Sequence, residues 1–280
     1  MYDSDRFSQK HIVIFSLIVS CVFVFIFGFG FLTIFTSLFI PPEILAIPSI
    51  EYFLSAINNF IALLFILILL KSIGLFDNIP WNISGVQKGL VLGISLLIFT
   101  VVQMLLIFII TPDKTIVIGL IPMINTLLYC LSIGLWEETL CRGFLLTNML
   151  KKWGNTKRGM VISIVFSSFI FGGLHIISAI NGNLFGSLVQ VMYASVMGIL
   201  LSVIYIKTKS LWSVIVLHII LNFPAYSMPY LVPGSAGMPF GLHLILIVLF
   251  NLLWIIVSYF LIIRMDVSDV EDLLDFNQKS

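Results

Sequence analysis

The sequence predicts an all-α polytopic membrane protein with about eight transmembrane helices and both termini in the cytoplasm. Hydrophobic residues make up 60% of the 280 residues and charged residues only 10%, a balance far outside that of soluble globular domains. Apolar runs of about 20 residues, the length that crosses a hydrocarbon core, recur along the whole chain. None of the segments between them is large enough to fold alone. The chain 1–280 is therefore interpreted as a single transmembrane bundle.

The expected spans follow one another with short connections. They are 12–36, 52–70, 89–111, 115–136, 159–178, 185–206, 210–226 and 241–263. When these spans alternate in direction, the Lys and Arg residues gather on one side of the membrane, and only Lys114 falls on the other. The positive-inside rule assigns the basic side to the cytoplasm. The sequence thus predicts a multi-pass cell-membrane protein, and its residue usage fits a bacterial cytoplasmic membrane.

Three segments are interpreted as architecture rather than chemistry. The first span is too long for the core of a signal peptide and is not followed by a small-residue cleavage site, so we expect it to remain in the mature protein. Gly85, Gly89 and Gly93 are spaced by four and place small residues on one helical face, which predicts close packing against another helix. The acidic end of the chain, 265–280, is expected to be a solvated cytoplasmic tail.

A few polar residues lie at membrane depth, where each is a candidate for function because its burial is costly. They are Glu137, Glu138 and Arg142 near the end of the fourth span, His175 in the fifth, and His218 with Asn222 in the seventh. Glu138 and Arg142, four residues apart, share a helical face and can pair, whereas Glu137 points about 140° away from Arg142. A simpler alternative is that the charges reach the cytoplasmic headgroups and that each histidine bonds to a backbone carbonyl.

These residue types together are suited to hydrolysis. A carboxylate, two imidazoles and a carboxamide can activate water and stabilise an oxyanion, either around a divalent metal or by general-base chemistry without one. In either case we expect Glu138 and Arg142 to hold the helix end and to fix the orientation of Glu137.

Three short motifs resemble those of a known family. EETLCR (137–142), FGGLH (171–175) and HIILN (218–222) resemble the successive EExxxR, FxxxH and HxxxN motifs of the CPBP intramembrane protease family, also called the Abi or CAAX protease family. Their order, and the placement of each within a membrane span, makes the resemblance specific. It covers a family-like catalytic core of about 115–226, and the other spans match only in kind and number.

The resemblance implies a bundle of eight helices with a catalytic cavity open to the cytoplasmic leaflet and the lateral membrane. It implies that Glu137 activates water, that Glu138 and Arg142 support it, and that His175, His218 and Asn222 line the site. In the metalloprotease account a divalent metal such as zinc is bound, with Glu137, His175 and His218 as candidate ligands. In the glutamate-peptidase account the histidines and Asn222 stabilise the oxyanion.

The leading functional hypothesis is an intramembrane endopeptidase, of metallo- or glutamate type, that hydrolyses peptide bonds of membrane-associated proteins or peptides. Its expected partners are that substrate and the lipid bilayer, with no nucleic acid. The main alternative is a non-catalytic membrane protein, such as a bacteriocin self-immunity protein or a scaffold. A transporter with a proton relay ranks last, because the sequence shows no internal repeat of the kind that many transporters have.

Overall fold

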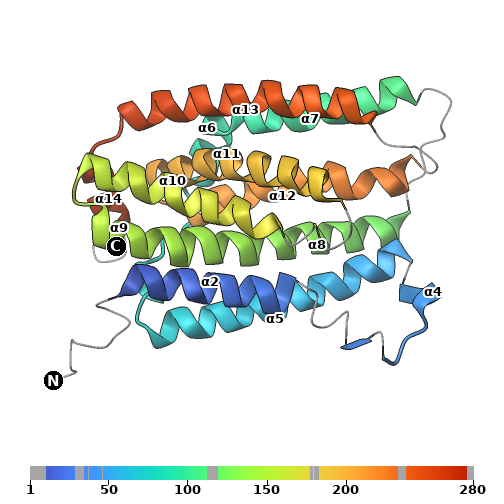
Figure 1. The fold of residues 1–280 in the computed structure, drawn as a ribbon, viewed down its shortest axis with the longest axis horizontal. Coiled ribbons are helices and arrows are strands. Elements are labelled where there is room, and N and C mark those ends of the chain that lie inside the picture. Colours follow the sequence, from blue (N-terminus) through green and yellow to red (C-terminus); the bar gives the residue numbers. More distant parts are fainter. Residues whose placement is uncertain are drawn as a thin grey trace.

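The computed structural model describes residues 11–28, 35–36, 38–45, 47–111, 119–176, 179, 183–232 and 238–275. Every regular element in this part of the chain is helical, which confirms the predicted all-α class. Figure 1 shows the long helices side by side in one elongated bundle. Residues 1–10 and 276–280 lie outside the described residues, so the cytoplasmic location of both termini stays a prediction.

The long helices follow six of the expected spans closely. The first helix ends at Gly28, short of the expected span 12–36, and residues 29–34 of that span and 115–118 of the fourth lie outside the described residues. The long helices are α2 (Ile12–Gly28), α5 (Pro48–Ser72), α6 (Val86–Leu92) with α7 (Ile94–Ile110), α8 (Leu120–Glu138), α10 (Lys157–Leu174), α11 (Leu184–Thr208), α12 (Leu211–Leu231) and α13 (Phe240–Ile263). The shorter elements are α4 (Pro42–Leu45), η1 (Phe76–Asn78), η2 (Thr139–Leu146), α9 (Thr147–Trp153) and α14 (Val267–Leu274). Within the described residues, six helices are long and apolar enough to cross a membrane, or seven if a bent pair counts as one span. Eight spans therefore remain a prediction.

The third expected span is the bent pair. α6 and α7 meet at an angle of 67°. The predicted glycine stripe packs tightly on α12, because a Cβ atom on Gly85 or Gly89 would lie 2.4 Å from Cβ of Ser210 or 2.5 Å from Cβ of Ser213. This confirms the predicted close approach, which fixes the beginning of the helix that carries His218.

The fourth expected span does not end at its charged motif. α8 continues through η2, a π-helical segment, into α9, so that Leu120–Trp153 forms one helical element of 34 residues. π-Helical segments are rare and frequently occur at functional sites. The expectation that Glu138 and Arg142 hold a helix end is wrong, because the helix continues beyond them and every residue of η2 is buried.

The acidic end of the chain is not entirely a solvated tail. α14 buries Val270 and Leu273. Its carboxylates form two ion pairs with the end of α11, Lys207–Asp269 at 3.2 Å and Lys209–Asp272 at 2.6 Å. The expectation of a solvated segment is therefore wrong for α14, which packs on the bundle because it is amphipathic.

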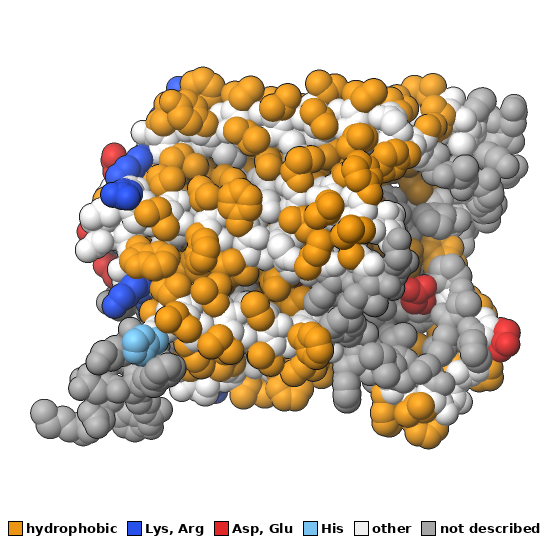
Figure 2. All heavy atoms as spheres, in the orientation of Figure 1, with side chains coloured by type: hydrophobic (Ala, Val, Ile, Leu, Met, Phe, Trp, Pro, Cys, Tyr) orange, Lys and Arg blue, Asp and Glu red, His pale blue; other side chains and the backbone are white. Residues whose placement is uncertain are grey.

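The two ends of the bundle differ in charge, as Figure 2 shows in the blue side chains gathered at its left. We call this end the basic end. The helix ends that meet there carry Lys88 near the start of α6, Lys152 near the end of α9, Arg158 near the start of α10, and Lys209 and Arg264 just after α11 and α13. The opposite end carries Glu43 and Glu51. Apolar side chains cover the flank between the ends, and many large ones are exposed there. This surface and the long apolar helices make the chain a multi-pass membrane protein.

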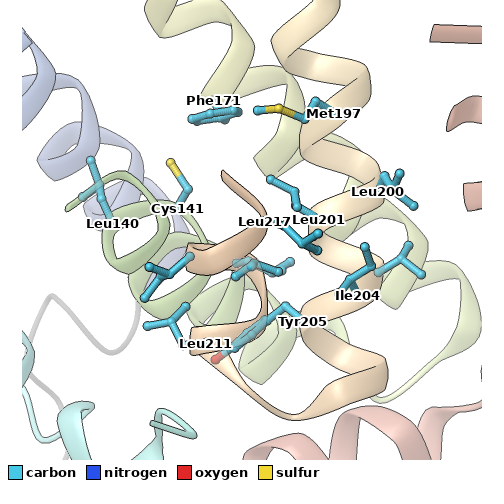
Figure 3. Close-up of a cluster of buried hydrophobic side chains, with 14 of the residues drawn as sticks. Leu140, Cys141, Phe171, Met197, Leu200, Leu201, Ile204, Tyr205, Leu211 and Leu217 are labelled. Carbon is cyan, nitrogen blue, oxygen red and sulfur yellow. The ribbon is translucent and has the colours of Figure 1, made fainter. Parts of the chain in front are cut away.

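A cluster of buried apolar side chains joins η2 to three other helices, as Figure 3 shows. We call these residues the basic-end core: Leu140, Cys141, Phe171, Met197, Leu200, Leu201, Ile204, Tyr205, Leu211 and Leu217. They come from η2, α10, α11 and α12, and none is more than 3% exposed. Side chains from four helices therefore pack together in this part of the interior.

Candidate active site

Glu138 and Arg142 form a buried ion pair. Oε1 of Glu138 accepts a hydrogen bond from Nη1 of Arg142 at 2.8 Å, and neither side chain is more than 2% exposed. Nη2 of Arg142 donates to the carbonyl oxygen of Gly198 at 3.1 Å, and the guanidinium lies 4.7 Å from the centre of the Phe171 ring. The predicted pairing across one helical turn is confirmed. The alternative that these charges reach the headgroups is wrong, because their partners lie inside the bundle.

His218 lies between the two glutamates. Its Nδ1 is 2.7 Å from Oε1 of Glu138, and its Nε2 is 3.9 Å from Oε2 of Glu137. The same oxygen, Oε1 of Glu138, is therefore hydrogen-bonded to both Arg142 and His218. A carboxylate only accepts hydrogen bonds, so Nδ1 of His218 carries a proton, and Nε2 is the nitrogen directed at Glu137.

Glu137 faces a cavity of about 250 Å³. Its side chain is 19% exposed, whereas that of Glu138 is fully buried. His175, His218 and Asn222 line the same cavity. The structure thus brings four of the predicted residues around one space and places the other two, Glu138 and Arg142, behind His218.

The FGGLH motif holds His175 at the end of α10. Its Nδ1 is 3.0 Å from the carbonyl oxygen of Phe171, so the alternative of a carbonyl-bonded histidine holds for this side chain. The Phe171 ring meets the rings of His175 and His218 edge-on, with centroids 5.1 Å and 6.2 Å apart. Phe171 therefore contacts both imidazoles and Arg142.

The described side chains do not fit a metal centre. Zinc in proteins is held by three or four His, Cys, Asp or Glu ligands at about 2.0–2.3 Å. Among the residues that the structure describes, no group of three such side chains is placed to hold a metal ion. Glu137, His175 and His218 share the cavity, and the hydrogen bond at Nδ1 of each histidine leaves only Nε2 of each ring as a possible ligand.

Sequence reasoning missed several polar residues that line the cavity. They are Ser55, Asn58 and Asn59 of α5 and Gln190 of α11. Asn59 donates through Nδ2 to Oγ of Ser132 at 3.1 Å, which holds its amide in place. The sequence did contain a sign of this polar wall, because the two adjacent asparagines lie in the middle of an apolar span, where polar side chains are as unusual as a histidine.

Four tyrosines form a second missed feature, the tyrosine cluster: Tyr52, Tyr129, Tyr226 and Tyr230. Tyr52 stacks on Tyr129 with centroids 5.1 Å apart, and Tyr226 meets Tyr129 edge-on at 4.9 Å. Tyr129 and Tyr226 also line the cavity. Because these residues come from α5, α8 and α12, no local spacing in the sequence connects them.

The two glycines of FGGLH allow a matched test of how α10 is placed. A Cβ atom on Gly172 would lie 2.0 Å from Oγ of Ser195 and 2.6 Å from the carbonyl oxygen of Val191, whereas one on Gly173 would meet nothing within 4 Å. We expect Gly172→Ala to force α10 away from α11 and to cost about 1–3 kcal/mol of stability, with loss of activity as Phe171 moves.

The matched variant Gly173→Ala should be as stable as the wild type, or more stable by up to about 1 kcal/mol, because alanine favours helix. Thermal unfolding of the two purified variants in detergent measures the difference. Equal stability of both variants would contradict this packing of α10 on α11.

A known family model matches part of the chain. Residues 119–224 match the family model described as type II CAAX prenyl endopeptidase Rce1-like. The matched segment begins just before α8 and ends within α12, so it includes all six predicted site residues. No curated protein and no solved structure matches the chain.

Proposed function

We propose, on the premise that residues 119–224 belong to the Rce1-like family of CAAX-type endopeptidases, that this chain hydrolyses peptide bonds of membrane-associated proteins or peptides with Glu137 as the group that activates water. The match confirms the resemblance to the CPBP family and supports an intramembrane endopeptidase in general. The charge distribution and the residue usage favour the cytoplasmic membrane of a bacterium as its location.

Glu137 would act as the general base. Its carboxylate lies at the cavity wall, within reach of a water that attacks the carbonyl carbon of the substrate. The carboxylate takes one proton from that water as the new C–O bond forms. When the tetrahedral intermediate collapses, the C–N bond breaks, and the same proton passes from Glu137 to the leaving amine.

His218 and Asn222 would stabilise the oxyanion of that intermediate. Both line the cavity one helical turn apart on α12, and donors fixed in advance are effective because they need no rearrangement during the reaction. The pair of Glu138 with Nδ1 fixes the ring of His218, which leaves Nε2 for the cavity. Nε2 would donate to the oxyanion when the ring carries a proton on both nitrogens. His175 borders the same space from α10.

One observation carries this proposal: the two adjacent carboxylates occupy opposite environments across a single imidazole. Glu138 is fully buried and paired with Arg142, whereas Glu137 is partly exposed to the cavity and 3.9 Å from Nε2 of His218. Two carboxylates with different surroundings take different roles in catalysis. A passive scaffold requires no such asymmetry.

The test compares membrane and secreted peptides by mass spectrometry in cells that make the wild-type protein or Glu137→Gln at matched levels. We expect new termini only with the wild type, and these termini would identify the substrate and its cleavage site. Matching peptide profiles, together with a phenotype that persists in the variant, would reject the enzyme in favour of an immunity protein or scaffold. Proton-coupled uptake that is lost in Glu137→Gln would favour the transporter.

A further inference from the structure

We propose that a second cavity, at the end of the bundle opposite the basic end, binds a membrane phospholipid through the ester groups of that lipid. The cavity has a volume of about 230 Å³, close to that of the cavity at Glu137, and no described residue lines both. The proposal goes beyond the proposed function, because lipid binding requires no hydrolysis. The described residues that line the second cavity are Gln103 and Ile107 of α7, Pro224 and Ala225 of α12, Met238, and His243 of α13.

The second cavity lies at the depth where the hydrocarbon of a bilayer begins. α7 ends and α13 begins at the end of the bundle opposite the basic end. His243 lies in the first turn of α13, and Gln103 lies about 10 Å along α7 from its last residue, Ile110. The cavity therefore reaches from the border between headgroups and hydrocarbon into the hydrocarbon itself. The ester groups of phospholipids occupy this border, and their acyl chains follow directly below.

Two polar side chains face the second cavity without partners. Within the described residues, neither the amide of Gln103 nor the ring of His243 forms a hydrogen bond. The cavity at Glu137 differs in this respect, since Asn59 is bonded to Ser132 and His218 to Glu138. A polar group that lies in the hydrocarbon without a partner costs free energy, so we expect the molecule that fills the second cavity to supply one.

The chemistry of the wall favours an ester. The amide of Gln103 has two N–H donors and the neutral imidazole of His243 has one, whereas an ester carbonyl only accepts. The other described lining residues are apolar and suit the methylene groups next to the ester. Lys and Arg, which bind phosphate most strongly, are missing from the described lining, so the phosphate of the lipid is expected to lie outside the cavity.

The second cavity can be reached from the surrounding lipid. Ala225 is exposed, and Gln103 and His243 are partly exposed. Two of the helices that form the cavity, α7 and α13, also present exposed apolar side chains such as Leu105 and Ile245 to the surroundings. A phospholipid beside the bundle can therefore enter sideways without crossing a polar surface.

The second cavity adjoins α12 at a point where that helix is weakened. Pro224 has no backbone N–H, so the helix lacks one of its hydrogen bonds there. Residues two apart on a helix differ in direction by about 160°, so Pro224 and the site residue Asn222 face nearly opposite sides of α12. A lipid in the second cavity would lie behind the turn that presents Asn222 and would support that turn.

The test measures the binding of a named lipid by native mass spectrometry of the purified protein in dodecyl maltoside, a detergent without an ester. Dioleoyl phosphatidylglycerol is compared with the analogue that has the same headgroup and chain length but ether bonds in place of the esters. We expect one diester lipid to bind per protein with saturation, and the ether analogue to bind roughly 3–10-fold more weakly, the usual effect of losing one hydrogen bond. Equal binding of the two lipids would overturn the proposal.

Substitutions locate the bound lipid. Gln103→Leu and His243→Leu keep the approximate size of the side chains and remove the donors, so each should weaken binding of the diester lipid roughly 3–10-fold and leave that of the ether analogue unchanged. Gln87→Leu, the same change at an exposed position of α6, is the matched control and should bind both lipids as the wild type does. Wild-type binding in both cavity variants, or an equal loss in Gln87→Leu, would place the lipid elsewhere and reject the site.

Thermal unfolding in the same detergent compares the stability of the variants. Without lipid, Gln103→Leu should unfold at the temperature of the wild type or above it, because it removes an amide that has no partner among the described residues. With the diester lipid, the unfolding temperature of the wild type should rise by about 3–5 °C more than that of Gln103→Leu. A lower unfolding temperature for the lipid-free variant would show that Gln103 serves the fold rather than a ligand, which contradicts the proposal.

These measurements do not depend on the proposed function. Glu137→Gln should bind the diester lipid as the wild type does, since Glu137 does not line the second cavity. An inactive wild type that binds the lipid would reject only the proposed function. An active wild type that binds the two lipids equally would reject only the lipid site.

Discussion

Purified Glu137→Gln protein is expected to hydrolyse its substrate roughly 10²–10⁴-fold more slowly than the wild type, because that is the usual contribution of a general base. Glutamine has nearly the same shape but cannot accept the proton of the attacking water. The loss should appear in kcat with little change in KM, since the size of the cavity is retained. Initial rates on the peptide identified by mass spectrometry give both parameters.

The same variant should fold normally. The Glu137 side chain is partly exposed, and its separation from His218, 3.9 Å, is long for an ion pair, so its removal should change the free energy of unfolding by no more than about 0.5 kcal/mol. Glu51→Gln, an exposed position at the opposite end, is the control and should retain full activity. Wild-type rates in Glu137→Gln would remove Glu137 from the reaction.

Arg142→Met should produce the largest loss of stability, about 3–5 kcal/mol, which is the usual cost of breaking a buried ion pair by removing one partner. The substitution leaves the fully buried Glu138 carboxylate without its cation. Oε2 of Glu138 already has no hydrogen-bond partner among the described residues, so little remains to stabilise the charge. Denaturant unfolding of the purified protein in mixed micelles measures the loss.

Two controls separate the buried pair from charge in general. Lys207→Met breaks the partly exposed pair with Asp269 and should cost only about 0–1 kcal/mol. The double variant Arg142→Met with Glu138→Leu should be less destabilised than the sum of the two single variants, because it removes both charges together. A cost for Arg142→Met no greater than that of Lys207→Met would show that the pair is not buried as described.

The positions of the helices could be predicted because hydropathy is a local property. A run of apolar residues must cross or border the hydrocarbon, whatever its neighbours are, and α11 and α13 begin and end within two residues of the expected spans. The pairing of Glu138 with Arg142 was equally local, since residues four apart meet on any helix. For the same reason the approach of α6 to another helix was visible in its glycine spacing.

The features that the sequence did not reveal depend on contacts between helices. The fourth helix continues past its charged residues because Gly198, Phe171 and His218, all from other helices, compensate them. A span boundary placed at those charges was therefore wrong for a reason that no local pattern contains. The tyrosine cluster likewise arises only when α5, α8 and α12 are brought together.

The 34-residue element from Leu120 to Trp153 is longer than the membrane that it crosses. At 1.5 Å per residue it approaches roughly 50 Å, against about 30 Å of hydrocarbon. It must therefore tilt or project beyond the lipid, where Lys151 and Lys152 meet the headgroups. Hydrophobic mismatch then acts on the same helical element that carries Glu137 and the Glu138–Arg142 ion pair. Bilayer thickness therefore affects the geometry of the site, because a thinner or thicker bilayer changes the tilt of this element, and so the position of Glu137, relative to α12 and His218.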